Sequence, residues 1–118
     1  MIAHVVLFRP RRALSADRRR ALAASFEAAL QQIPSIRRAR VGRRLVLGRA
    51  YEALTRADYP YMAILEFDDR NGLTAYLEHP AHDQLAAQFF GAFEEALILD
   101  VELAEGAAGL VELAGNRP

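Results

Sequence analysis

The chain has 118 residues, of which 53% are apolar, and its formal net charge at neutral pH is zero. This length suits one domain with a single core, and the apolar content excludes an intrinsically disordered protein. No apolar run approaches the roughly 18 to 20 residues that a membrane-spanning helix needs, so we expect no membrane partner. The opening MIAHVVLFRPRR places its apolar run before its positive charges, the reverse of a secretory signal. Because cysteine is absent, disulfides and thiolate chemistry are excluded, and we expect a cytoplasmic protein.

The charges are unevenly distributed along the chain. Residues 1–59 carry 13 arginines and four acidic residues, a net charge of +9, whereas residues 60–118 carry two arginines and 11 acidic residues, a net charge of −9. The arginines are spread over a predicted helix and strand without interleaved aromatic residues, so we expect no nucleic-acid partner. Opposite charges on the two halves indicate instead that they meet when subunits pair, in a contact that high salt would weaken.

The first half of the chain predicts a strand, a helix and two more strands. The apolar stretch 2–8 predicts the first strand, and Ser15 is a suitable helix N-cap. The apolar residues of the helix recur at helical spacing as far as Pro34: Leu22, Phe26, Leu30 and Ile33. Alternation then predicts a second strand, marked by Val41, Leu45 and Leu47. A third strand is expected over 61–67, and the segment before it contains tyrosines that either cover a cavity or pack on the surface: Tyr51, Tyr59 and Tyr61.

The second half predicts two helices and a last strand. A short helix carries Tyr76, and Pro80 suits the first position of the next helix because proline lacks the amide that would be unpaired there. That helix is expected to continue through apolar residues at steps of four: Leu85, Phe89, Phe93 and Leu97. The alternating residues that follow predict the last strand: Leu99, Val101 and Leu103. Residues 104–118 form an extension rich in small residues, which we expect to be flexible, with 110–113 as a candidate edge strand.

The order β-α-β-β-α-α-β predicts a ferredoxin-like α+β subunit with helices on one face of the sheet. The first strand, IAHVVLF, and the middle of the third, MAIL, are apolar on both sides rather than on alternate residues. Such strands are buried on both faces, and one chain of this length has nothing left to cover the second face. We therefore expect a homodimer packed sheet against sheet.

Four stretches in order resemble the Dabb family, the stress-responsive dimeric α/β-barrel domain: IAHVVLF, IPSIRRARVG, YPYMAILEFDD and AYLEHPAH. The resemblance runs from about residue 1 to about residue 103 with matching spacing, so the expected domains are 1–103 and the extension 104–118. It implies that two sheets form a dimeric α/β barrel, with a cavity between each sheet and its helices. Some members are polyketide cyclases that perform an aldol condensation without a cofactor. Their working residues match His82, the second histidine of HPxH, Tyr76 six residues earlier, and His4 in the first strand.

The residue types agree with that chemistry, and structural interpretations stand beside it. His82 lies in the first turn of its predicted helix, where the helix dipole favours a neutral imidazole that can act as a base. Tyr76 can donate its hydroxyl to a carbonyl oxygen. Alternatively, His82 and His4 are hydrogen-bonded structural residues and Tyr76 fills the core. His79 is expected to cap the helix, and a metal site formed by His79, His82 and Asp83 lacks a third strong ligand fixed by sequence.

We therefore expect a protein that binds a small apolar or aromatic carbonyl compound without a cofactor or metal, with cyclase or aldol-type lyase chemistry as the enzymatic form. Two alternatives remain open at this point. One is a stress-response or interaction dimer without chemistry, its interior filled by side chains, and the other is a cofactor-free monooxygenase. Glycine-rich phosphate loops, Ser-His-Asp motifs and dinucleotide fingerprints are absent from the sequence, which argues against nucleotide and hydrolase functions.

Overall fold

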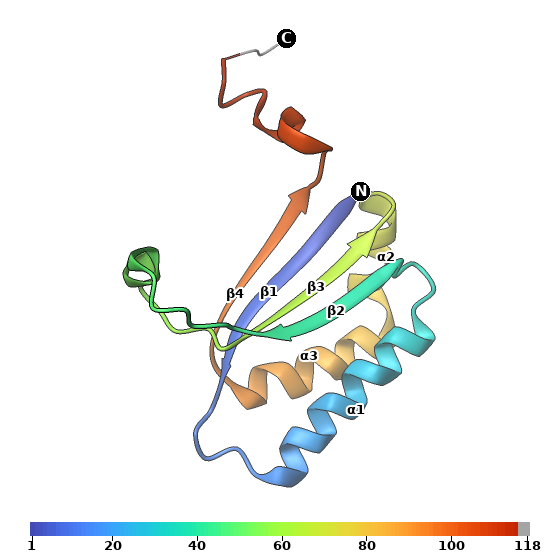
Figure 1. Cartoon of the computed structure of the whole chain (residues 1–118). Helices are drawn as coiled ribbons and strands as arrows, with labels where there is room; N and C mark the ends of the chain where they lie inside the picture. The colour runs from blue at the N-terminus through green and yellow to red at the C-terminus, as the bar shows by residue number, and fades with distance from the viewer. Residues whose placement is uncertain (116–118) are drawn as a thin grey trace.

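A computed structural model describes residues 1–115 as one sheet covered on one face by helices (Figure 1). The strands are β1 (Ile2–Pro10), β2 (Arg38–Arg43), β3 (Tyr61–Phe67) and β4 (Phe93–Glu102). The helices are α1 (Ala16–Gln32), α2 (Arg70–Glu78) and α3 (Pro80–Ala92), with short 3₁₀ helices η1 (Ala50–Leu54) and η2 (Gly106–Leu110). The predicted ferredoxin-like order of strands and helices is therefore confirmed.

The sheet has the strand order β2-β3-β1-β4, and all neighbouring strands are antiparallel. Register places His4 opposite Leu65 on β3 and Asp100 on β4, so these three residues lie in one row across the sheet. Because side chains alternate between the faces of a strand, the even-numbered residues of β1 from Ile2 to Phe8 face the helices.

Local signals in the sequence explain where the helices begin. Ser15 Oγ accepts a hydrogen bond from the amide of Arg18 at 3.2 Å, as expected for the N-cap of α1. At α3, Pro80 occupies the first helical position and His79 is the N-cap. The helices bury a core in which Phe67 and Leu65 are fully enclosed, and this core fixes the helical layer against the sheet.

Two predicted boundaries are wrong, and tertiary structure explains both. The chain leaves α3 after Ala92, so Phe93 and Leu97 belong to β4 rather than to the helix. The spacing of four was misleading, because Leu97 pairs with Leu7 in the sheet. Strand β2 ends at Arg43, where its pairing with β3 ends, and Leu45 and Leu47 lie beyond it, largely exposed.

The face of the sheet opposite the helices is apolar and uncovered. Register brings together an apolar row on neighbouring strands of that face: Leu7, Met62 and Leu97, with Val5, Ile64 and Leu99 in the next row. Met62, Leu97 and Leu99 are 37%, 41% and 47% exposed. The apolar character of both faces, predicted from sequence, thus corresponds to an unpartnered surface in the protomer.

Two segments extend beyond the two-layered body, one at each end of the sheet (Figure 1). The radius of gyration is 16.2 Å, compared with about 13.5 Å for a compact domain of this length. Residues 44–60 project past the end of β2, and residues 104–115 continue beyond β4. In the described part of the extension, 110–113 form the end of η2 and turns, so the candidate edge strand is wrong; residues 116–118 lie outside the described residues. No helix within residues 1–115 is long and apolar enough to cross a membrane.

Candidate functional site

A cavity of about 730 Å³ lies between the sheet and the helices, in the size range of sites for small organic ligands. All three site residues predicted from sequence line it: His4 from β1, Tyr76 from α2 and His82 from α3. Most of the remaining lining is apolar, with an aromatic cluster at the far end formed by Phe8, Phe89 and Phe93.

Tyr76 lies between the two histidines and is 3% exposed. Its ring centroid is 4.7 Å from that of His82, in an edge-to-face arrangement, and 5.6 Å from that of His4. The ring also contacts Phe67 on β3, which holds it against the sheet. Burial raises the pKa of Tyr76 from 10.0 to about 12, so the phenol keeps its proton at neutral pH and remains a hydrogen-bond donor.

His82 occupies the third position of α3, directly after the chain bend at Pro80. Burial lowers the pKa of His82 below its ordinary value of 6.5, and positive charge on His4 lowers it further. The Asp83 carboxylate and the backbone of Leu77 oppose this shift without reversing it. The imidazole is therefore neutral at physiological pH and is available as a proton acceptor.

His4 is held by a partner that sequence reasoning missed. Its Nδ1 lies 2.6 Å from Oδ1 of Asp100, which also lines the cavity. An ionised carboxylate only accepts hydrogen bonds, so Nδ1 carries the proton and donates it to Asp100. The carboxylate thereby fixes the orientation of the His4 ring. The second ring nitrogen, Nε2, takes no part in this hydrogen bond.

In the sequence, Asp100 stands out only as a polar position in the alternation of the last strand. Its pairing with His4 follows from the β1–β4 register, and residues 96 positions apart carry no local pattern that would join them. Only the sheet topology shows that Asp100 lies opposite the buried His4.

His79 does not join the cavity. Its Nδ1 accepts a hydrogen bond from the Ala81 amide at 3.0 Å, so the expected capping role is confirmed. Across residues 1–115 no group of three histidine, aspartate or glutamate side chains is placed to hold a metal ion. The segment 44–60 contributes no residue to the cavity lining. Of Tyr51, Tyr59 and Tyr61, therefore, Tyr61 alone lines the cavity.

Fold and site together define a ferredoxin-like α+β protein with a mostly apolar cavity and a cluster of two imidazoles, a phenol and a carboxylate. The family model described as the stress responsive A/B barrel domain, Dabb, matches residues 2–103. The chain belongs to this family, as its four sequence stretches indicated.

Solved structures share this fold at low sequence identity. A crystal structure from Arabidopsis thaliana matches with a TM-score of 0.73 and 18% identity, over 90% of this chain and 98% of that chain. The hydroxynitrile lyase of Passiflora edulis matches with a TM-score of 0.73 and 20% identity, over 89% and 94%. A dimeric ferredoxin-like protein of unknown function from Thermobifida fusca matches with a TM-score of 0.66 and 20% identity, over 86% and 90%. No curated protein matches the chain in sequence.

Proposed function

We propose that the protein binds a small apolar or aromatic carbonyl compound in its cavity and moves a proton on it without a cofactor. The observation that carries this proposal is the convergence of a neutral imidazole and a neutral phenol on one mostly apolar cavity. The apolar wall favours a hydrophobic ligand, and the polar end supplies a base and a hydrogen-bond donor for its carbonyl group.

The proposed reaction begins with enolisation. His82 takes the proton from the carbon next to the carbonyl group, and the electrons of that C–H bond form a C=C bond as the carbonyl electrons move to oxygen. Tyr76 donates its hydroxyl to this oxygen and stabilises the developing negative charge. The carbon nucleophile then attacks a second carbonyl carbon, whose oxygen receives a proton from the His82 imidazolium. This is an aldol-type cyclisation, and its reverse is a lyase reaction.

Two further observations support this chemistry. Asp100 holds His4 with Nε2 free, so this nitrogen can orient the substrate. One structural neighbour, the Passiflora edulis protein, is a hydroxynitrile lyase, and the fold therefore accommodates lyase chemistry. The cavity volume also favours a ligand-binding protein over a dimer whose interior is filled by side chains.

We further propose that the protein is a homodimer that pairs the open faces of two sheets. The uncovered apolar rows of β1, β3 and β4 support this arrangement, because their burial is favourable in proportion to apolar area. The structural neighbour from Thermobifida fusca is a dimeric ferredoxin-like protein. Light scattering at micromolar concentration should give twice the chain mass of 13.1 kDa.

Proton abstraction can be tested before the natural substrate is known. An aryl alkyl ketone incubated with the protein in D₂O should exchange its α-protons faster than in buffer, as followed by proton NMR. His82→Gln should lower the protein-dependent exchange rate by roughly 100-fold, the usual contribution of a positioned base. Tyr76→Phe should lower it while leaving ketone binding largely intact, because the ring is kept.

His79→Asn is the matched control. This change keeps a capping side chain at the start of α3 and should leave the exchange rate unchanged. If His82→Gln exchanges ketone protons as fast as the unsubstituted protein and binds the ketone equally well, His82 has no catalytic role and the proposal is refuted.

A further inference from the structure

The segment 44–60, here called the arm, is ordered by its own hydrogen bonds. The Glu52 carboxylate accepts hydrogen bonds from the backbone amides of Leu47 and Arg49, both at 2.8 Å. Gly48 between them has φ +76°, a conformation that lets the chain reverse so that both amides reach one carboxylate. The Leu47 amide in particular lowers the pKa of Glu52, because the hydrogen bond favours the charged carboxylate. The arm therefore has a defined shape.

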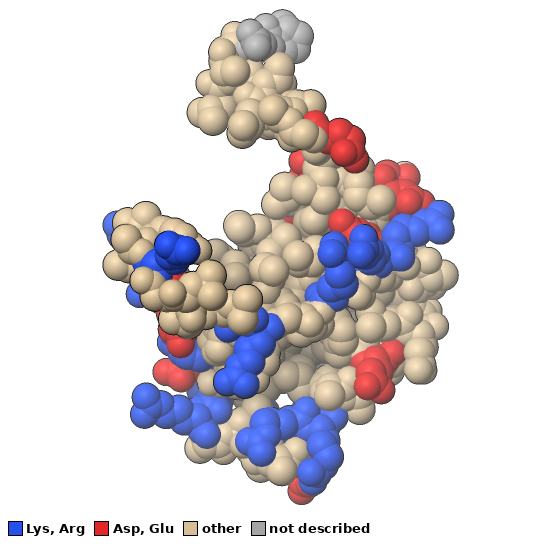
Figure 2. Space-filling view, in the orientation of Figure 1, with Lys and Arg blue, Asp and Glu red and all other residues tan. Residues whose placement is uncertain are grey.

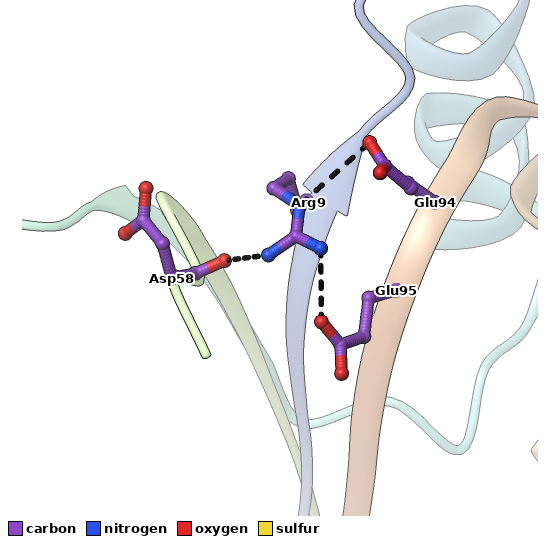
Figure 3. A network of polar contacts seen from close by, with 4 residues as sticks. All are labelled: Arg9, Asp58, Glu94 and Glu95. Atoms are coloured by element: carbon purple, nitrogen blue, oxygen red, sulfur yellow. Dashed lines mark hydrogen bonds and ion pairs between the residues drawn. The ribbon is translucent and has the colours of Figure 1, made fainter. Parts of the chain in front are cut away.

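The base of the arm is fixed to the sheet by charged groups (Figure 3). Arg9 on β1 donates to the backbone carbonyl of Asp58 at 2.9 Å and pairs with Glu95 at 3.0 Å and Glu94 at 3.8 Å. Arg44 pairs with the Asp58 carboxylate at 2.9 Å. These contacts connect the arm to β1 and β4 and set the direction in which it projects.

Although it is ordered, the arm exposes large apolar side chains. Five of them are 62% to 81% exposed: Leu45, Val46, Leu47, Tyr51 and Leu54. The arm contributes nothing to the cavity lining. An apolar surface held in place on a projecting segment is typical of a surface that another polypeptide covers.

The described part of the C-terminal segment, residues 103–115, has the same character. Beyond the contact of Leu103 with Met1, its backbone hydrogen bonds are local, and all its residues are exposed. Its large apolar residues include Leu110, Val111 and Leu113, which are 56%, 43% and 83% exposed.

The two segments carry opposite charges. The arm contains three arginines and two acidic residues, Glu52 and Asp58, a net charge of +1. The C-terminal segment contains Glu105 and Glu112 and no arginine between 103 and 115, a net charge of −2. In Figure 2, basic and acidic side chains both lie around the arm, and acidic side chains lie where the C-terminal segment leaves the body. Both segments therefore offer exposed apolar surface, and their small net charges are opposite in sign.

Within one chain these segments leave opposite ends of the sheet (Figure 1). The arm leaves the sheet where Phe8 pairs with Tyr61, and the C-terminal segment leaves it where Ile2 pairs with Glu102. Six residues of β1 separate these ends, or about 20 Å. A twofold axis that crosses the strands would place the Phe8 end of one sheet over the Ile2 end of its partner.

We infer that in the homodimer the arm of each subunit packs against the C-terminal segment of the other. This inference rests on the proposed sheet-to-sheet homodimer and adds two symmetry-related contacts at its ends. The occupant of the exposed apolar surface on the arm is thus a second copy of this chain. The contacts would extend the dimer interface beyond the open sheet faces and help to set its register.

The absence of cysteine from the natural sequence makes a direct test possible. The 118-residue chain with Leu47→Cys and Leu110→Cys is prepared unlabelled and ¹⁵N-labelled, the two forms are mixed, and the dimers are oxidised. We expect disulfides between residues 47 and 110 of differently labelled chains, identified by mass spectrometry of the joined peptides. An intrachain link joins peptides that carry the same label, so it cannot imitate this result. A disulfide also requires Cα atoms about 4.4 to 6.8 Å apart, so each mixed-label link reports a close contact between the two segments. Leu47→Cys with Gln31→Cys, an exposed position on α1, is the matched control and should give no link.

The outcomes distinguish this inference from the proposal on which it rests. Mixed-label 47–110 links in a dimer support the proposed packing of the arm against the partner's C-terminal segment, here called the clasp. A dimer by light scattering that gives no such link overturns the clasp and leaves the sheet-to-sheet dimer standing, whereas a monomer overturns both. As a second measurement, Leu54→Asp and Leu113→Asp should each raise the dimer dissociation constant by roughly tenfold or more, with unchanged far-UV circular dichroism. Unchanged dissociation constants in both variants would also overturn the clasp.

Discussion

Alkaline pH should destabilise the protein through Tyr76. The phenol is buried between His82 and Phe67, and burial raises its pKa to about 12 in the folded chain, compared with 10.0 when unfolded. As the pH rises past 10, the unfolded chain loses this proton while the folded chain keeps it. Stability that is complete below pH 10 is therefore lost progressively up to about pH 12.

The size of this loss follows from the two pKa values. At pH 11 the unfolded phenol is mostly ionised and the folded one mostly neutral, which removes about 1.4 kcal/mol of unfolding free energy, and complete ionisation removes about 2.7 kcal/mol. The sequence suits the measurement, because without lysine no ammonium side chain titrates between pH 9 and 12. Without tryptophan or cysteine, ultraviolet absorbance near 295 nm reports the tyrosinates alone.

Urea unfolding at pH 8 and pH 11 compares the unsubstituted protein with Tyr76→Phe. The variant should lose about 1.4 kcal/mol less between the two pH values. Its spectrophotometric titration should also lack the late component, about one quarter of the total change from four tyrosines. Tyr51→Phe, at a position 62% exposed, is the control and should retain the late component. If Tyr76→Phe and the unsubstituted protein lose the same stability and titrate alike, the phenol is not buried as described.

Three further predictions concern the site and the core. Because the pKa of His82 is lowered in the folded chain, stability should fall as the pH drops below 6.5, and His82→Gln should reduce the loss between pH 7.5 and 5.5 seen by urea unfolding. Asp100→Asn should reduce α-proton exchange by roughly tenfold and change the ¹⁵N NMR shifts of His4, while changing stability by less than about 1 kcal/mol because Asp100 is half-exposed. Phe67→Ala should lower the unfolding free energy by about 3 to 5 kcal/mol, because Phe67 is completely buried; Phe90→Ala, 68% exposed, should change it by less than about 0.5 kcal/mol.

Each of these predictions has an outcome that contradicts it. An equal acid-induced loss of stability with and without His82 would show that this imidazole does not resist protonation. His4 resonances that do not respond to Asp100→Asn would mean that the carboxylate does not fix the ring. Similar unfolding free energies for Phe67→Ala and Phe90→Ala would place the core elsewhere.

The fold was predictable because its local signals agree with one another. The cap at Ser15, the proline at position 80 and the apolar first strand each specify a backbone conformation through neighbouring residues. The predictions that were wrong concern apolar spacing, which fits more than one structure. Phe93 and Leu97 continue the helical spacing of four, and pairing with β1 places them in a strand.

The sequence by itself determined the α+β order, the apolar character of both sheet faces and the candidate residues Tyr76, His82 and His4. These follow from periodicity, from local chemistry, and from the family resemblance of short stretches. Only the tertiary structure decided that a cavity separates the sheet from the helices and that Asp100 holds His4. Cavities depend on how side chains from distant elements pack, and the His4–Asp100 contact depends on strand register. Neither property is contained in any local stretch of the chain.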